Sequence, residues 1–148
     1  MSKLIYPVES YAIKGAAMEV YKLVGNGFLE AVYQECLERE FMVRGILFAA
    51  QRPLALTYRG ELLTASYKPD FVCYNKIIVE IKAVATLTSE HRAQLLNYLK
   101  ATKYQLGFLF NFGHYPMLEQ VRLANTTNLA QVLFTPTEEL EELRELEC

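Results

Sequence analysis

The sequence of 148 residues predicts an α/β fold in which helices pack on a mixed sheet. Apolar residues recur at helical spacing early in the chain and again after residue 88, whereas short runs of β-forming residues lie between and after these segments. A chain of this length buries one hydrophobic core, and no repeat or Pro/Gly-rich linker divides it. We therefore expect a single domain over residues 1–148, with an acidic helix at about residues 136–148.

Two helices are expected first. Apolar spacing predicts one helix from Glu9 to about Val24, where Gly25-Asn26-Gly27 interrupts the pattern. A second helix is expected from about residue 28 to residue 43, with Gly45 placed to end it. Its expected apolar stripe comprises Phe28, Val32, Cys36 and Leu37.

The next segments predict strands and one more helix. A hairpin is expected over residues 54–67, with its turn at Arg59-Gly60. The run Ile77–Lys82 is apolar enough for a central strand. Further strands are expected at residues 71–74, 104–112 and 118–123, and a helix capped by Thr88 or Ser89 is expected to end near residue 100.

Composition excludes several classes of protein. The three cysteines are far apart and unpaired in sequence, which favours reduced thiols over a disulfide framework or a zinc site. No apolar run is long enough to cross a bilayer, so we expect a cytoplasmic protein without a membrane partner. The net charge of −2 includes −5 from Pro136–Cys148, so residues 1–135 carry +3 and suit an anionic partner.

The segment most informative about chemistry is Asp70 followed ten residues later by Glu80-Ile-Lys82. Residues two apart in a strand share a face, so Glu80 and Lys82 are expected to project together. Burying charges in so apolar a strand is costly unless they are paired or bind a metal. Two carboxylates suit a hard cation such as Mg²⁺, and a lysine can assist the attacking water during phosphodiester hydrolysis. The competing interpretation is a plain ion pair with Asp70, or a sheet edge with both side chains in water.

Two of the expected helices offer supporting residues. Glu30 and Gln34 are four apart, so both can face one site; Glu30 also suits the first turn of a helix, where the dipole favours an anion. Gln94 and Tyr98 are likewise four apart and could contact a nucleotide, although an ordinary helix face explains them as well. His91 has no Ser or Cys partner by spacing and is not expected to be catalytic.

These residues lie within longer motifs that resemble a known family. The quoted segments are Gly27-Phe-Leu-Glu30-Ala-Val-Tyr33, Pro69-Asp70, Val79-Glu-Ile-Lys-Ala83, His91-Arg-Ala-Gln94-Leu-Leu-Asn-Tyr98-Leu and Asn111-Phe-Gly113. Together they resemble the GxxExxY family of the PD-(D/E)XK nuclease superfamily, over roughly residues 11–122. The resemblance implies a restriction-endonuclease-like core in which Glu30, Asp70, Glu80 and Lys82 meet at one edge of the sheet.

The leading interpretation is a metal-dependent nuclease. Asp70, Glu80 and Glu30 would bind Mg²⁺ or Mn²⁺, Lys82 would assist the water, and Gln94 and Tyr98 would contact the nucleic acid, with DNA expected. A homodimer is expected only by analogy with other enzymes of this fold. Two alternatives stay open: a catalytically silent binding module, and a subunit of a larger complex in which the acidic helix docks a partner.

Overall fold

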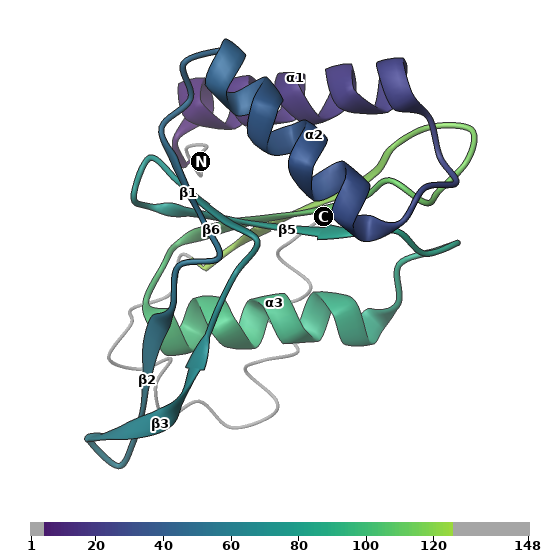
Figure 1. Ribbon diagram of the computed structural model, residues 1–148. Helices are drawn as coiled ribbons and strands as arrows, with labels where there is room; N and C mark the ends of the chain where they lie inside the picture. The colour runs from purple at the N-terminus through teal and green to yellow at the C-terminus, as the bar shows by residue number, and fades with distance from the viewer. Residues whose placement is uncertain (1–4, 126–148) are drawn as a thin grey trace.

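The computed structural model describes residues 5–125. A five-stranded sheet forms its centre, with two helices on one face and one helix on the other (Figure 1). The helices are α1 (Pro7–Val24), α2 (Glu30–Val43) and α3 (Ser89–Thr102). The strands are β1 (Phe48–Ala50), β2 (Leu54–Tyr58), β3 (Glu61–Tyr67), β4 (Phe71–Cys73), β5 (Ile77–Lys82), β6 (Leu106–Asn111) and β7 (Glu119–Ala124).

The sheet is mixed, as the sequence predicts. Within residues 5–125 its strand order is β1-β4-β5-β6-β7, and only β5 and β6 are parallel. Parallel neighbours need a crossover, and α3 supplies it between these two strands. The parallel register sets Glu80 beside Leu109 and Lys82 beside Asn111. The mixed α/β architecture is that of a restriction-endonuclease-like fold.

Strand β5 divides its side chains between the two faces of the sheet. Ile77, Val79 and Ile81 are fully buried in the core that also contains α1 and α2. Ile78 belongs to the core beneath α3, and the pleat therefore directs Glu80 and Lys82 to that same face. The predicted alternation along this strand is confirmed, so both charged side chains share one surface.

The predicted apolar stripe of the second helix is wrong in two of its four residues. The buried residues of α2 are Tyr33, Leu37 and Phe41, whereas Phe28 and Val32 are 53% and 38% exposed. The helix starts at Glu30, two residues later than expected, so Phe28 precedes it. Tyr33 can be buried because its hydroxyl donates to the carbonyl of Gly25 (2.5 Å), which satisfies the polar end of the ring.

The predicted hairpin forms, but outside the central sheet. Among the described strands, β2 and β3 pair only with each other, through a turn at Arg59 and Gly60 in which both residues have positive φ. Figure 1 shows this hairpin extending away from the sheet and past α3. The short edge strand β1 was not expected from sequence, because its three residues carry no alternating pattern.

Two further expectations concern the acidic C-terminal segment and membrane crossing. The acidic helix expected at about residues 136–148 lies outside the described residues. Among the helices of residues 5–125, none combines the length and the apolar character that a membrane crossing requires.

Amide hydrogen exchange should separate the hairpin from the central sheet. All residues of β6 are buried, whereas β3 is exposed except at Tyr67. Exposed strands with few core contacts open locally at low free-energy cost. We expect the amides of β2 and β3 to exchange orders of magnitude faster than those of β5 and β6. Equal protection in the two regions would contradict this arrangement.

Candidate active site

Two hydrogen bonds join Asp70 to the Glu80-Ile81 segment of β5. The backbone N–H of Asp70 donates to Oε1 of Glu80 (2.7 Å), and the backbone N–H of Ile81 donates to Oδ2 of Asp70 (2.8 Å). Asp70 lies just before β4, whose first residue Phe71 pairs with Val79 of β5. The two carboxylates are therefore fixed at the point where β4 begins beside β5.

Two glutamines complete the environment of Asp70. Nε2 of Gln51 donates to Oδ1 of Asp70 (3.2 Å), and the Gln51 N–H donates to the Asp70 carbonyl (3.2 Å). Nε2 of Gln34 also donates to that carbonyl (3.3 Å), which confirms that Gln34 faces the site. Gln51 has φ of +56°, a conformation uncommon outside glycine. No sequence pattern singled out Gln51, because its role depends on a contact nineteen positions away in the chain.

Lys82 lies beside the carboxylates on the same face of β5. Within residues 5–125, its amine makes no contact of 4 Å or less with a carboxylate, so the simple ion pair with Asp70 is not what the structure shows. Glu30 is the first residue of α2 and is close enough to Asp70 and Lys82 for their charges to act on its pKa. The structure thus brings Glu30, Asp70, Glu80 and Lys82 to one region.

The pKa values of all three carboxyl groups are raised. Burial is the main cause for Glu80, and the nearby Asp70 charge adds to it, which brings the pKa of Glu80 to about 7. Burial also raises the pKa of Asp70, against the opposing hydrogen bond from Ile81 and the Lys82 charge. Desolvation, then the Asp70 charge, raises the pKa of Glu30. Ionising this cluster costs free energy, and a bound cation would offset that cost.

A tyrosine that was not assigned from sequence lies beside Glu80. The hydroxyl of Tyr67 is buried and has no hydrogen-bond partner among the described residues. Burial, then the Glu80 charge, raises the pKa of Tyr67, so the phenol stays neutral. The Tyr98 ring stacks on Tyr67 with 3.7 Å between centroids and 3° between planes. Tyr98 is therefore linked to the carboxylates through Tyr67, while Gln94 is exposed on the same helix.

The loop that follows Lys82 is held by Asn111. Its Oδ1 accepts from the N–H groups of Val84 (3.0 Å) and Gly113 (3.1 Å), and its Nδ2 donates to Glu119 (2.9 Å). Glu119 also accepts from the N–H of Leu87 (2.9 Å). Desolvation raises the pKa of Glu119, but the hydrogen bonds from Asn111 and Leu87 outweigh it, and the net pKa is lowered. This network fixes the backbone directly after the lysine.

Tyr33 fixes the loop that precedes Glu30. Its buried hydroxyl accepts from the N–H of Phe28 (3.2 Å) as well as donating to Gly25, and its ring stacks on Phe112 at 4.8 Å. Gly27 in the same loop has φ of +107°, which favours glycine. The spacing of Gly27, Glu30 and Tyr33 therefore has a structural reason: the glycine and the tyrosine determine where Glu30 begins the helix.

The two histidines have other contacts. His91 belongs to a capping box, in which its N–H donates to Oγ1 of Thr88 (3.3 Å) and its Nδ1 accepts from the Thr88 N–H (3.1 Å). Nδ1 of His114 lies 2.8 Å from the Met117 carbonyl.

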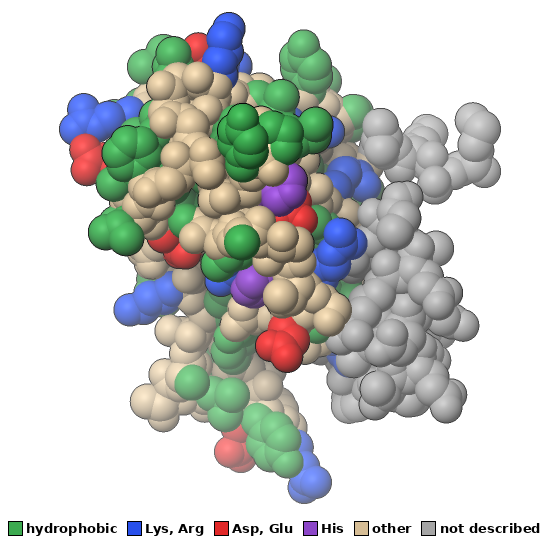
Figure 2. All heavy atoms as spheres, turned by 90° about the vertical axis from the view of Figure 1, so that its right-hand side faces the viewer, with side chains coloured by type: hydrophobic (Ala, Val, Ile, Leu, Met, Phe, Trp, Pro, Cys, Tyr) green, Lys and Arg blue, Asp and Glu red, His purple; other side chains and the backbone are tan. Residues whose placement is uncertain are grey.

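Figure 2 shows the face of the molecule that lies on the right-hand side of Figure 1. Histidine, acidic and basic side chains are scattered among apolar ones on this face, so neither sign of charge dominates it.

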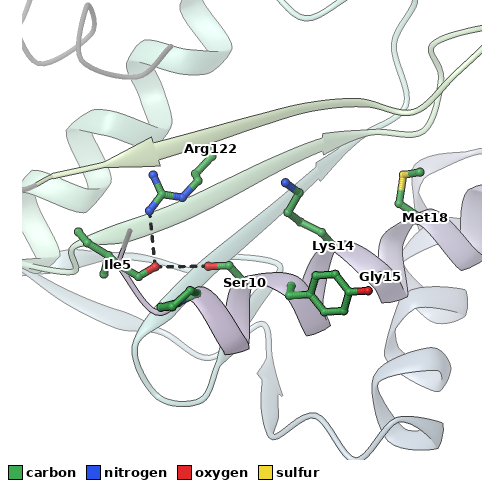
Figure 3. A pocket seen from close by; sticks show the side chains of 8 residues that line it. Ile5, Ser10, Lys14, Gly15, Met18 and Arg122 are labelled. Atoms are coloured by element: carbon green, nitrogen blue, oxygen red, sulfur yellow. Dashed lines mark hydrogen bonds between the residues drawn. The ribbon is translucent and has the colours of Figure 1, made fainter. Parts of the chain in front are cut away.

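A cleft on the surface of α1 lies apart from the site carboxylates. It measures about 410 Å³ and lies between α1 and the Arg122 side chain of β7 (Figure 3). Lys14, Met18 and Arg122 line it, and none of the predicted site residues does. It does not contribute to the candidate active site.

The donor set suits a magnesium ion that keeps part of its water shell. Within residues 5–125, no group of three or more Asp, Glu, His or Cys side chains is placed to hold a metal ion. Mg²⁺ is commonly bound by one or two carboxylates, with waters and substrate phosphate oxygens as the remaining ligands. Asp70 and Glu80 match that pattern, but Glu30 does not join them in a cluster of three metal-ligating side chains within residues 5–125.

The fold and site define a class of protein: a restriction-endonuclease-like α/β domain with paired carboxylates and a lysine on a central strand. The family model described as the PD-(D/E)XK nuclease superfamily matches residues 8–123. The chain belongs to that superfamily.

Other comparisons are less specific. One similar solved structure is described as "Crystal structure of SSO0001"; it has 14% sequence identity and a TM-score of 0.47, and the match covers 95% of this chain and 87% of that one. No curated protein matches.

Replacing Glu80 by glutamine should stabilise the metal-free protein above pH 7. The raised pKa means that the folded state holds the proton to higher pH than the unfolded state, so the free energy of unfolding falls as pH rises from about 4.5 to about 7. Glutamine keeps an acceptor for the Asp70 N–H without the charge. At pH 8 in EDTA, we expect Glu80→Gln to gain on the order of 3 kcal/mol in urea unfolding.

The gain should disappear near pH 4, where the wild-type carboxyl is itself protonated. Glu61→Gln, at an exposed hairpin position, is the matched control and should change little. Equal stability of wild type and Glu80→Gln at pH 8 would show that ionising Glu80 has no cost.

Replacing Gly113 by alanine should disturb the backbone after Lys82. An added Cβ would lie 2.5 Å from the N atom of Val84, a backbone contact that no side-chain movement can relieve. We expect a loss of about 1–3 kcal/mol in the free energy of unfolding.

The matched control is Gly15→Ala, in the interior of α1. Its Cβ would meet only the end of the flexible Arg44 side chain at 3.0 Å, and alanine favours a helix. Gly15→Ala should therefore be neutral or stabilising in the same unfolding measurement. Similar losses in both variants would contradict a special role for Gly113.

Proposed function

We propose that this protein is a metal-dependent nuclease that uses Mg²⁺ or Mn²⁺ to hydrolyse phosphodiester bonds in nucleic acid, with DNA as the expected substrate. The observation that carries the proposal is the pair of hydrogen bonds between Asp70 and the Glu80-Ile81 segment. Lys82 lies beside them and has no ion-pair partner within residues 5–125. Membership of the superfamily supports the nuclease class. The narrower GxxExxY assignment rests on the sequence motifs.

The carboxylates and the lysine have distinct roles in this proposal. Asp70 and Glu80 would hold the cation, with Glu30 acting on its waters. A bound Mg²⁺ supplies charge stabilisation and a more acidic water. Lys82 orients the attacking water and offsets the negative charge that develops on the phosphate oxygens as water oxygen bonds to phosphorus and one ester P–O bond breaks. The buried Tyr67 phenol lies next to Glu80 and stays neutral.

The substrate would extend over α3. Tyr98 stacks on Tyr67 and is half-buried, and Gln94 is exposed one turn earlier on the same helix. An amide and a phenol can both donate to phosphate oxygens or contact a base. These residues therefore provide substrate contacts in the proposal, outside the carboxylate cluster itself.

A silent binding module with the same fold is the alternative function. The raised pKa values of the site carboxyl groups favour the enzyme, because a module without a cation would carry the cost of ionising them and gain nothing in return. A homodimer and a cytoplasmic location remain part of the proposal.

Cleavage of labelled DNA and RNA oligonucleotides tests the proposed function. We expect cutting with Mg²⁺ or Mn²⁺ that EDTA abolishes. Lys82→Ala should lower kcat by about 10²–10³-fold, because it removes a charge that stabilises the transition state.

Lys14→Ala, which removes an exposed lysine on α1, is the matched control and should retain kcat. Both variants are purified identically, which separates this protein from a contaminating nuclease. Equal activity in wild type and Lys82→Ala, or no activity in either, would contradict the assignment.

A further inference from the structure

A cleft lies between side chains of the hairpin and of α3. It measures about 560 Å³, and it is lined by Leu56 and Leu63 of the hairpin and by Gln94, Asn97 and Tyr98 of α3. Figure 1 shows the hairpin passing alongside α3. Its volume lies in the range typical of sites for small organic groups.

The chemistry of the cleft disfavours a phosphate and favours a flat, uncharged group. Among the described residues that line it, none is Lys, Arg or His, and Glu90 at its edge would repel an anion. Leucine side chains from the hairpin offer apolar contact, while the amides of Gln94 and Asn97 can both donate and accept hydrogen bonds. A nucleobase has the matching features: apolar faces and a polar edge.

A stacked pair of tyrosines lies between the cleft and the candidate active site. Tyr98 lines the cleft and stacks on Tyr67, whose pKa responds to the charge of Glu80. Phosphate and base would therefore be received in adjoining regions of different charge: the phosphate beside Lys82 and the base between the hairpin and α3.

A base inside a duplex must leave its stack and its base-pairing partner before it can enter this cleft. Unstacking and unpairing both cost free energy. An unpaired base avoids the cost of breaking a pair. We propose that the cleft between the hairpin and α3 binds one unpaired nucleobase next to the scissile phosphate, so that the preferred substrate is single-stranded or has a single-stranded end. The inference rests on the proposed nuclease function and adds the class of substrate.

Binding of short oligonucleotides in EDTA tests the cleft without requiring cleavage. The probes are a labelled single-stranded hexanucleotide and an abasic hexamer with the same phosphates. Because the base adds apolar contact with the cleft, wild type should bind the normal hexamer at least about fivefold more tightly in fluorescence anisotropy. Equal affinity for the two probes, or no binding of either, would overturn the proposal.

Asn97→Trp tests the location of the base. Asn97 is exposed on α3, so a tryptophan there should fill the cleft without disturbing the core. This variant should bind the two hexamers equally, whereas Met42→Trp, which adds the same side chain at an exposed position of α2, should keep the wild-type preference. A preference that survives in Asn97→Trp would overturn the proposal.

The cleavage assay separates failure of this inference from failure of the nuclease function. With Mg²⁺, we expect wild type to cut a duplex with a single-stranded extension at least about fivefold faster than the blunt duplex, and Asn97→Trp to lose that difference. Metal-dependent cutting of both duplexes at equal rates would support the nuclease function and refute base binding in the cleft. Base-dependent binding in EDTA without any cutting would refute the nuclease function.

Discussion

The hydrogen bonds that connect Asp70 with Glu80 and Ile81 are the constraint on which the site depends. Each carboxylate accepts a backbone N–H from the segment that carries the other, at 2.7 and 2.8 Å. The same two bonds therefore attach the start of β4 to β5 and orient both acids. Bonds from a backbone N–H to a charged acceptor are stronger than neutral ones.

The surrounding structure supports this pair from several directions. Gln51 and Gln34 donate to Asp70 from the segments before it, and Tyr33 fixes the loop that leads to Glu30. On the other side, Asn111 holds the backbone after Lys82. Rigid support of this kind is what a reacting group requires, because small displacements of a catalytic side chain reduce the rate strongly.

The arrangement is costly to the isolated protein. Three carboxyl groups with raised pKa values lie near one another, and the lysine beside them makes no ion pair among the described residues. A sequence selected for stability alone would replace such a cluster by apolar residues. The cost is explained if the cluster binds a cation and a phosphate in function.

The sequence predicted the fold and the central strand well because their signals are local. Alternation along Ile77–Lys82 shows which side chains share a face, and Thr88 caps α3 as expected. It failed at Phe28 and Val32, because an aromatic residue with a hydroxyl, Tyr33, occupies the core instead. Gln51 and Tyr67 were not assigned, since their roles arise from contacts between distant segments that no periodicity records.

The most direct test of the central claim is a calorimetric titration of Mn²⁺ into the wild-type chain and into Asp70→Asn. We expect saturable binding to wild type, loss of that binding in Asp70→Asn, and retained binding in Glu61→Gln. Absence of binding to wild type, or the same binding in wild type and Asp70→Asn, would contradict a metal site built on Asp70 and Glu80.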